Sequence, residues 1–148
     1  MKKLIGFALL LVACRGSMTP SSTLKPAPSG PGAATASAAV TAFLAAAKAG
    51  DLQAFALAWG DEKGPARDNI ARDELEKREV FLIRCLRHDK ATQLSDAQGA
   101  SGTRVLSVQL TAGALTRSTN FTAVVGPSNR WYVKSFEQAA VNDICLMR

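Results

Sequence analysis

SAAVTAFLAAAKAGDLQAFALAWG, residues 37–60, is the stretch that decides how the chain folds. In its first half, four apolar residues follow the spacing i, i+3, i+4, i+7 of one helix face. They are Val40, Phe43, Leu44 and Ala47. Ser37 is a suitable N-cap, and Gly50 is placed to end the helix in the left-handed conformation. Asp51 can cap a second helix at once, whose apolar stripe is Leu52, Phe55, Ala56 and Trp59. The pattern predicts two consecutive helices.

A third helix is expected further along the chain. The segment 60–67 carries charges, glycine and proline and is predicted to be a loop. Asp68 or Asn69 then opens a helix that runs to about Arg87, with acidic residues early and basic residues late, as the helix dipole favours. The charged run 73–79 is expected to be a solvated helix face. Residues 80–83 are apolar nearly all round, which predicts burial on more than one side or a change from helix to strand.

After residue 88 the apolar pattern changes to the alternation typical of strands. Glycine-rich or proline-containing turns at 99–102, 112–113 and 126–129 separate the segments. The predicted strands cover 90–96, about 106–110, 115–125 and 130–136, and a short closing helix carries Val141, Ile144 and Cys145. Helices followed by an antiparallel meander predict an α+β domain, with the N-terminal helices packed on a curved sheet of about four strands.

The first residues have the layout of an export signal. Lys2 and Lys3 are followed by an apolar run, 4–13, that is too short to cross a bilayer as a helix. The tetrapeptide Leu11-Val12-Ala13-Cys14 resembles the lipobox of bacterial lipoproteins. The resemblance implies that 1–13 is a cleaved signal peptide and that Cys14 becomes the lipidated N-terminus. An ordinary signal peptide with an incidental Cys14 is the alternative.

Residues 14–36 are predicted to be a disordered linker between this anchor and the domain. The segment holds four of the six prolines and almost no large apolar residue, so it cannot offset its ordering entropy. A Pro/Ser-rich recognition segment is the alternative. Arg15 stands where an Asp favours the inner membrane in enterobacterial lipoproteins, so the outer membrane is favoured, with the domain in the periplasm or at the cell surface.

The net charge of +6 belongs mostly to the leader and linker. Four of the 18 basic residues precede Ser37, whereas all 12 acidic residues follow it, so the domain 37–148 is close to neutral. This distribution argues against nucleic acid as a partner.

The order of elements resembles the cone-shaped fold shared by nuclear transport factor 2 and ketosteroid isomerase. The resemblance rests on the helix pair of residues 37–60, a third helix, and consecutive strands that end in Arg130-Trp131-Tyr132-Val133-Lys134. It implies a curved sheet around a long helix and an apolar pocket, here expected beside Phe43, Leu82 and Phe121. Members of that superfamily have unrelated functions, so the fold does not select one.

Two cysteines remain when Cys14 is assigned to lipid. Cys85 and Cys145 form an even pair in an exported domain, which favours a disulfide. Two buried free thiols, or a metal or catalytic role, are the alternatives. No cofactor is predicted, and no metal site, because the chain has one histidine and the two thiols are far apart in sequence.

His88, the only histidine, is followed by Asp89. A His beside a carboxylate could act as a general base, as in cone-fold dehydratases. Adjacent residues do not normally face each other, however. A helix-terminal cap and a ligand contact are the other two roles left open.

The segment 130–136 combines aromatic and basic residues. At period 2, Trp131 and Val133 share one face, and the other face carries Arg130, Tyr132, Lys134 and Phe136. We expect one face in the core and the other at an edge or interface; a platform for single-stranded nucleic acid is the alternative.

Two classes of function follow from these observations. The favoured one is a lipid-anchored envelope module without catalysis, held at the membrane through Cys14, that binds an apolar small molecule or an envelope protein and can pair with a second copy through its sheet. The alternative is a small hydrolyase or isomerase that uses His88 or Asp89. The enzyme gains support if these side chains lie at the bottom of the expected pocket.

Overall fold

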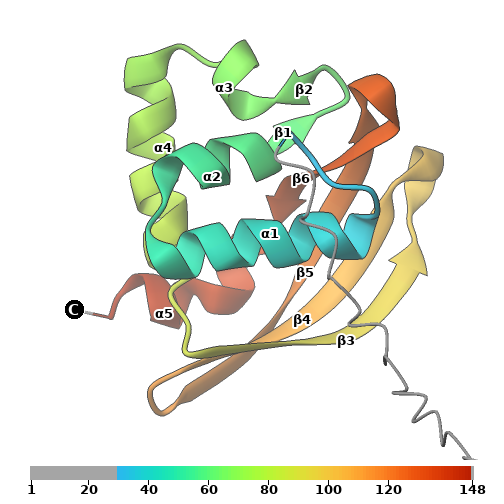
Figure 1. Cartoon of the computed structure of the whole chain (residues 1–148). Helices are drawn as coiled ribbons and strands as arrows, with labels where there is room; N and C mark the ends of the chain where they lie inside the picture. Colours follow the sequence, from blue (N-terminus) through green and yellow to red (C-terminus); the bar gives the residue numbers. More distant parts are fainter. Residues whose placement is uncertain (1–29, 148) are drawn as a thin grey trace, which may run out of the picture.

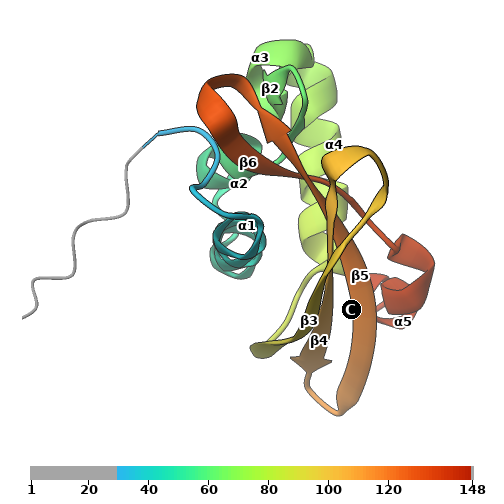
Figure 2. The ribbon, with the colours of Figure 1, turned by 90° about the vertical axis from the view of Figure 1, so that its right-hand side faces the viewer.

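The computed structural model describes residues 30–147 of the chain, and these form an α+β domain (Figure 1). Helices α1 (Ala36–Ala49) and α2 (Leu52–Ala58) pack against a four-stranded sheet, and α4 (Arg72–Cys85) packs against these two helices. Seen from the side, α1 and α2 lie on one side of the sheet (Figure 2). The predicted fold class is therefore confirmed. The predicted signal peptide, Cys14 and most of the predicted linker lie outside the described residues.

The helix pair forms as its sequence predicts. Gly50 adopts the left-handed conformation (φ 66°) and its N–H bonds back to α1. The Asp51 carboxylate then accepts from the N–H of Ala54 and caps α2. The predicted N-cap of α1 was wrong, because Thr35 caps the helix through its side chain, and the hydroxyl of Ser37 instead bonds to Gln93 on the sheet.

The connection between α2 and α4 is more structured than predicted. It forms a small hairpin, β1 (Gly60–Asp61) with β2 (Gly64–Pro65), and one helical turn, α3 (Ala66–Asn69). The single long helix expected from Asp68 or Asn69 is broken, because Ile70 takes an extended backbone (φ −121°, ψ 136°) that ends α3. Helix α4 then starts at Arg72.

The sheet is an antiparallel meander in the order β3-β4-β5-β6. Its strands are β3 (Lys90–Gln98), β4 (Arg104–Ala112), β5 (Leu115–Gly126) and β6 (Arg130–Phe136). Short 3-10 turns, η1 (Ala100–Gly102) and η2 (Pro127–Asn129), join β3 to β4 and β5 to β6. After β6, η3 (Gln138–Val141) and α5 (Asn142–Cys145) return to the core, where Val141 and Ile144 are fully buried.

An irregularity in β6 changes the faces expected there. Ala123 pairs with Val133 but Thr122 pairs with Ser135, so Lys134 is an extra residue. Phe136 therefore moves to the inner face, where its ring lies 5.6 Å from that of Phe121. The prediction that Phe136 shares a face with Tyr132 and Lys134 was wrong for this reason.

Aromatic rings fill the space between α1 and the sheet. The ring of Phe43 lies 4.2 Å from that of Phe55 and 6.2 Å from that of Phe121. All three side chains are buried, together with Leu106 and Leu110 of β4. The interior of the fold is a packed core at this place.

The last residues of the predicted linker belong to the domain. Gly32 donates to the carbonyl of Leu57, and Ala33 exchanges two backbone hydrogen bonds with Trp131 at the edge of β6. Trp59 makes a second bridge to the same strand, at Val133. Two residues of the segment that the composition assigned to the linker are thus hydrogen-bonded to the folded elements, because backbone pairing compensates for the small side chains.

No helix among residues 30–147 has the length and apolar character needed to cross a membrane.

Candidate functional site

His88 lies in the bend between α4 and β3 and is almost buried, with 8% of its surface exposed. Its Nδ1–H donates to the carbonyl of Leu86, 2.7 Å away, because a carbonyl can only accept. This bond satisfies a backbone group at the end of α4, which is the geometry of a helix-terminal cap. In the neutral ring Nε2 is then a hydrogen-bond acceptor.

The ring lies at the end of a groove between α1 and β3, which we call the α1–β3 groove. Its volume is about 250 Å³. Apolar side chains of α1 and the sheet, among them Leu44 and Val108, line it together with polar groups. The lining residues are Val40, Thr41, Leu44, Ala45, Lys48, His88, Ala91, Gln93 and Val108.

Two polar side chains of the groove are held in place by neighbouring elements. Lys48, in the last turn of α1, donates from Nζ to the carbonyl of Asp89 at 2.5 Å. Gln93 accepts from the Ser37 hydroxyl at 2.7 Å. The groove thus has an apolar floor with a cation and an imidazole at one end and an amide on the sheet side.

Asp89 has a structural role. Its Oδ2 accepts from the N–H of Gly113 at 2.8 Å, and its own N–H donates to Thr111. The carboxylate therefore supports the turn between β4 and β5. No hydrogen bond joins the side chains of His88 and Asp89 within residues 30–147, so the structure does not form the His-carboxylate pair that a general base would use.

The pocket expected beside Phe43, Leu82 and Phe121 is reduced to a hollow of about 150 Å³. Phe43 and Leu82 line it, whereas Phe121 is fully buried. Neither His88 nor Asp89 is among the residues that line this hollow, so their side chains do not lie at the bottom of the expected pocket.

A second hollow, of about 400 Å³, lies between the N-terminal segment and the outer sides of α1 and α2. We call it the alanine hollow, since six alanines of the helices and the preceding segment, together with Leu57, form most of its wall, and Arg130 also lines it. The Arg130 guanidinium is engaged by the carbonyls of Pro31 and Gly32. The remaining lining residues are Gly30, Gly32, Ala33, Ala34, Ala38, Ala42, Ala54 and Ala58.

Glu79 was missed as a candidate, because the run 73–79 was expected to be solvated. Only 2% of its surface is exposed, and Oε1 is buried without a hydrogen-bond partner among the described residues. Burial, with a smaller contribution from the charge of Glu76, raises its pKa from about 4.5 to about 7. The sequence signal was the stripe Leu75, Glu79, Leu82 and Leu86, which puts Glu79 on the apolar face of α4.

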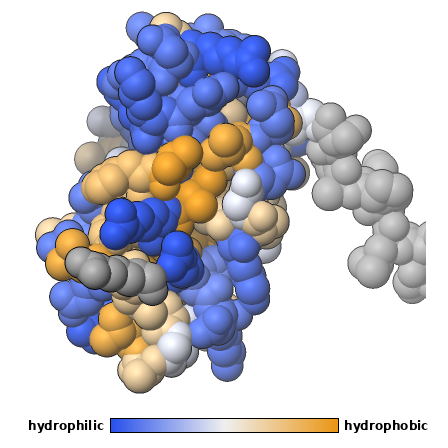
Figure 3. All heavy atoms as spheres, turned by 90° about the vertical axis from the view of Figure 1, so that its left-hand side faces the viewer, coloured by the Kyte–Doolittle hydropathy of each residue, from blue (hydrophilic) through white to orange (hydrophobic). Residues whose placement is uncertain are grey.

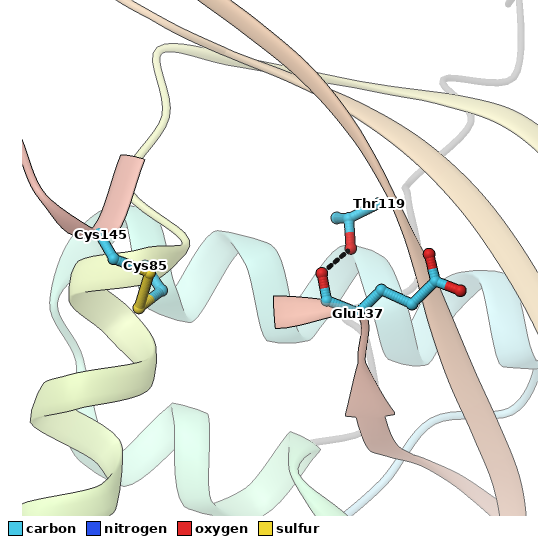
Figure 4. Close-up of a disulfide and its surroundings, with 4 residues drawn as sticks. All are labelled: Cys85, Thr119, Glu137 and Cys145. Carbon is cyan, nitrogen blue, oxygen red and sulfur yellow. Dashed lines mark hydrogen bonds between the residues drawn. A yellow bond between two sulfur atoms is a disulfide. The ribbon is translucent and has the colours of Figure 1, made fainter. Parts of the chain in front are cut away.

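The predicted disulfide between Cys85 and Cys145 is confirmed (Figure 4). It joins the last residue of α4 to the last residue of α5. Nearby, Thr119 of β5 donates to the carbonyl of Glu137 and fixes the chain as it leaves β6 (Figure 4). The disulfide thus secures the C-terminal segment to the helical layer.

Neither a metal site nor a relative was found for this chain among the described residues and the known proteins, respectively. Within residues 30–147, no group of three or more His, Cys, Asp or Glu side chains is arranged to hold a metal ion. Searches against protein-family models, curated proteins and solved structures found nothing that matches this chain.

Proposed function

We propose that this chain is an exported, lipid-anchored binding module of the cell envelope, and that its domain is a member of the cone-fold superfamily. In this proposal Cys14 carries the lipid, and the domain holds a small molecule with an apolar body in the α1–β3 groove. The order of helices and strands and the lipobox-like motif at 11–14 support the two parts.

The disulfide supports export. Disulfides persist in oxidising compartments and are rare in the cytosol. Cys85 is fully buried and Cys145 nearly so, which protects the bond from reductants. A structural disulfide behind an apolar leader is the combination expected of a secreted domain.

The observation that carries the ligand assignment is the α1–β3 groove itself. Small-molecule sites combine an apolar wall with a few converging polar groups. In the α1–β3 groove, Leu44 and Val108 are part of the apolar wall, and Lys48 is the cationic residue of the lining. A ligand with an apolar body and one acceptor or anionic group fits this set.

Native mass spectrometry of the full-length protein tests both parts. We expect a lipid mass on Cys14 and a bound small molecule. Replacing Ala45, an exposed residue of the groove, by Trp should displace the ligand. The matched control is Ala42→Trp, on the same helix but in the alanine hollow.

The outcomes separate the alternatives. Loss of the ligand only in A42W moves the site to the alanine hollow, and no bound molecule in any sample contradicts the ligand assignment. Absence of lipid on Cys14 contradicts the anchor alone.

A further inference from the structure

The outer face of α4 combines exposed apolar side chains with cations. Val80 is 60% exposed and Phe81 49% exposed, although both are large and apolar. Leu146, directly after the disulfide that ties α5 to α4, is 69% exposed. These are three of the four large apolar residues exposed in the described part of the chain.

Basic residues surround this patch. Arg84 lies on α4 one turn after Val80, and Arg87 follows the helix. Both line a hollow of about 430 Å³, together with Val80 and Lys48 of α1. Figure 3 shows this side of the molecule, where an orange area crosses the middle and blue atoms border it.

The cations of the patch are not neutralised within the described part of the chain. Neither Arg84 nor Arg87 forms an ion pair there. The acidic residues at the start of α4 are engaged, since Glu74 pairs with Arg78 and Glu76 with Arg72. The second half of the helix therefore has excess positive charge beside exposed apolar side chains.

We propose that this surface, formed by Val80, Phe81, Arg84, Arg87 and Leu146, rests on an anionic lipid bilayer. The apolar side chains enter the headgroup region, and the guanidinium groups meet lipid phosphates. An interfacial helix has this composition, with large apolar and basic residues together. Each basic residue near an anionic surface contributes about fivefold to the partition constant.

The proposed anchor places the surface within reach of the membrane; this step rests on the lipid proposed for Cys14. From Cys14 to Gly30, the first described residue, the chain spans at most about 55 Å when extended. A domain held at such a distance meets the bilayer at high effective concentration, so a weak surface attraction suffices to orient it.

A second copy of the chain is the competing occupant. An antiparallel α4–α4 contact would bring the acidic start of one helix to the basic end of the other. The pairs Glu74–Arg78 and Glu76–Arg72 already use these carboxylates, which favours the lipid surface.

Fluorescence quenching on the full chain in vesicles distinguishes these cases. One thiol is introduced by Val80→Cys, or by Ser118→Cys at an exposed position of β5 as the control, and labelled with an environment-sensitive dye. Spin-labelled lipids are added to phosphatidylcholine vesicles with or without phosphatidylglycerol. We expect several-fold stronger quenching at position 80 than at 118, only with the anionic lipid. R84Q/R87Q should lower the partition roughly 25-fold.

Equal quenching at positions 80 and 118 would overturn the proposal, as would quenching that is independent of lipid charge. Disulfide-linked dimers of unlabelled V80C, with no quenching of the labelled sample, would assign the surface to a second copy. The lipid mass on Cys14 is read from the same samples. Its absence with quenching preserved overturns the anchor and not the α4 surface.

Discussion

Glu79 couples the stability of the domain to pH, because its carboxyl is buried without a partner in the described structure. Its pKa is about 7 in the folded chain and about 4.5 when exposed. Between these values the unfolded chain releases the proton and the folded chain keeps it, so the free energy of unfolding falls as pH rises. Above pH 7 the full loss, at most about 3 kcal/mol, is present.

Replacing Glu79 by Gln should remove this pH dependence. Urea unfolding followed between pH 4.5 and 8 should show a decline for the wild-type chain and a nearly flat profile for E79Q. The control is Glu74→Gln on the same helix, whose side chain is about half exposed and paired with Arg78. A wild-type profile that rises with pH over this range would contradict the assignment.

A substitution at Gly32 tests whether the N-terminal segment packs against the rest of the domain. Its φ is +69°, and a Cβ there would lie 2.8 Å from the Tyr132 ring and 2.9 Å from Arg130 Cβ. Gly32→Ala should therefore cost the left-handed strain of about 1–2 kcal/mol and a further 1–3 kcal/mol or so of overpacking. Gly102→Ala is the matched control, because its φ is +77° but no atom lies within 4 Å of the added Cβ.

Urea midpoints of the two variants give the result. A larger loss in G32A than in G102A indicates that Gly32 is packed against β6. Equal losses would mean that only the backbone strain counts and that the segment is not packed there.

At the scale of elements, the disulfide links α4 to α5 across 60 residues of sequence. Closing a loop of this length removes up to about 4 kcal/mol of chain entropy from the unfolded state. Reduction, or C85S/C145S, should lower the free energy of unfolding by up to this amount. Urea titrations with and without reductant measure the difference.

Thiol labelling of the denatured full chain counts the cysteines independently. No thiol should react without reductant if Cys14 carries lipid, and two should react after reduction. One reactive thiol before reduction would mean that Cys14 is free, whereas two, or three if Cys14 is also free, would disprove the disulfide.

The elements that the sequence predicted well depend on local pattern. Strand β6 forms over Arg130–Phe136 as expected, and Gly50 and Asp51 separate the two helices. The features that were missed depend on contacts distant in sequence. The extra residue Lys134 in β6 is defined only by its register with β5. The sequence places Glu79 on the apolar stripe of α4, but its burial follows from how that helix packs.

The same distinction applies to the candidate site. Alternation of apolar residues over 106–110 predicted the strand that became β4, but not that aromatic rings would fill the space between the sheet and α1. His88 was singled out as the only histidine. Its hydrogen bond to Leu86 and its place at the end of the α1–β3 groove follow from the bend after α4, which no periodicity specifies.

At the scale of the whole molecule, the domain should resist proteolysis from a point earlier than Ser37. Gly32 and Ala33 are hydrogen-bonded to Leu57 and Trp131, so cleavage beyond them requires opening the edge of β6. Proteinase K digestion followed by mass spectrometry should give a resistant fragment that begins at or before Pro31. A fragment that begins at Ser37 would place the boundary where the composition alone suggested.

The two edges of the sheet differ in a way that limits assembly. The edge of β6 is already bonded to Ala33 and Trp59, whereas β3, at the other edge, is exposed along its whole length. Two copies joined edge to edge through β3 would have β6 as both outer strands. Such an assembly stops at two copies and does not grow into a filament. The backbone of each outer strand β6 is already bridged to Ala33 and Trp59, at Trp131 and Val133, and cannot pair there with a further copy.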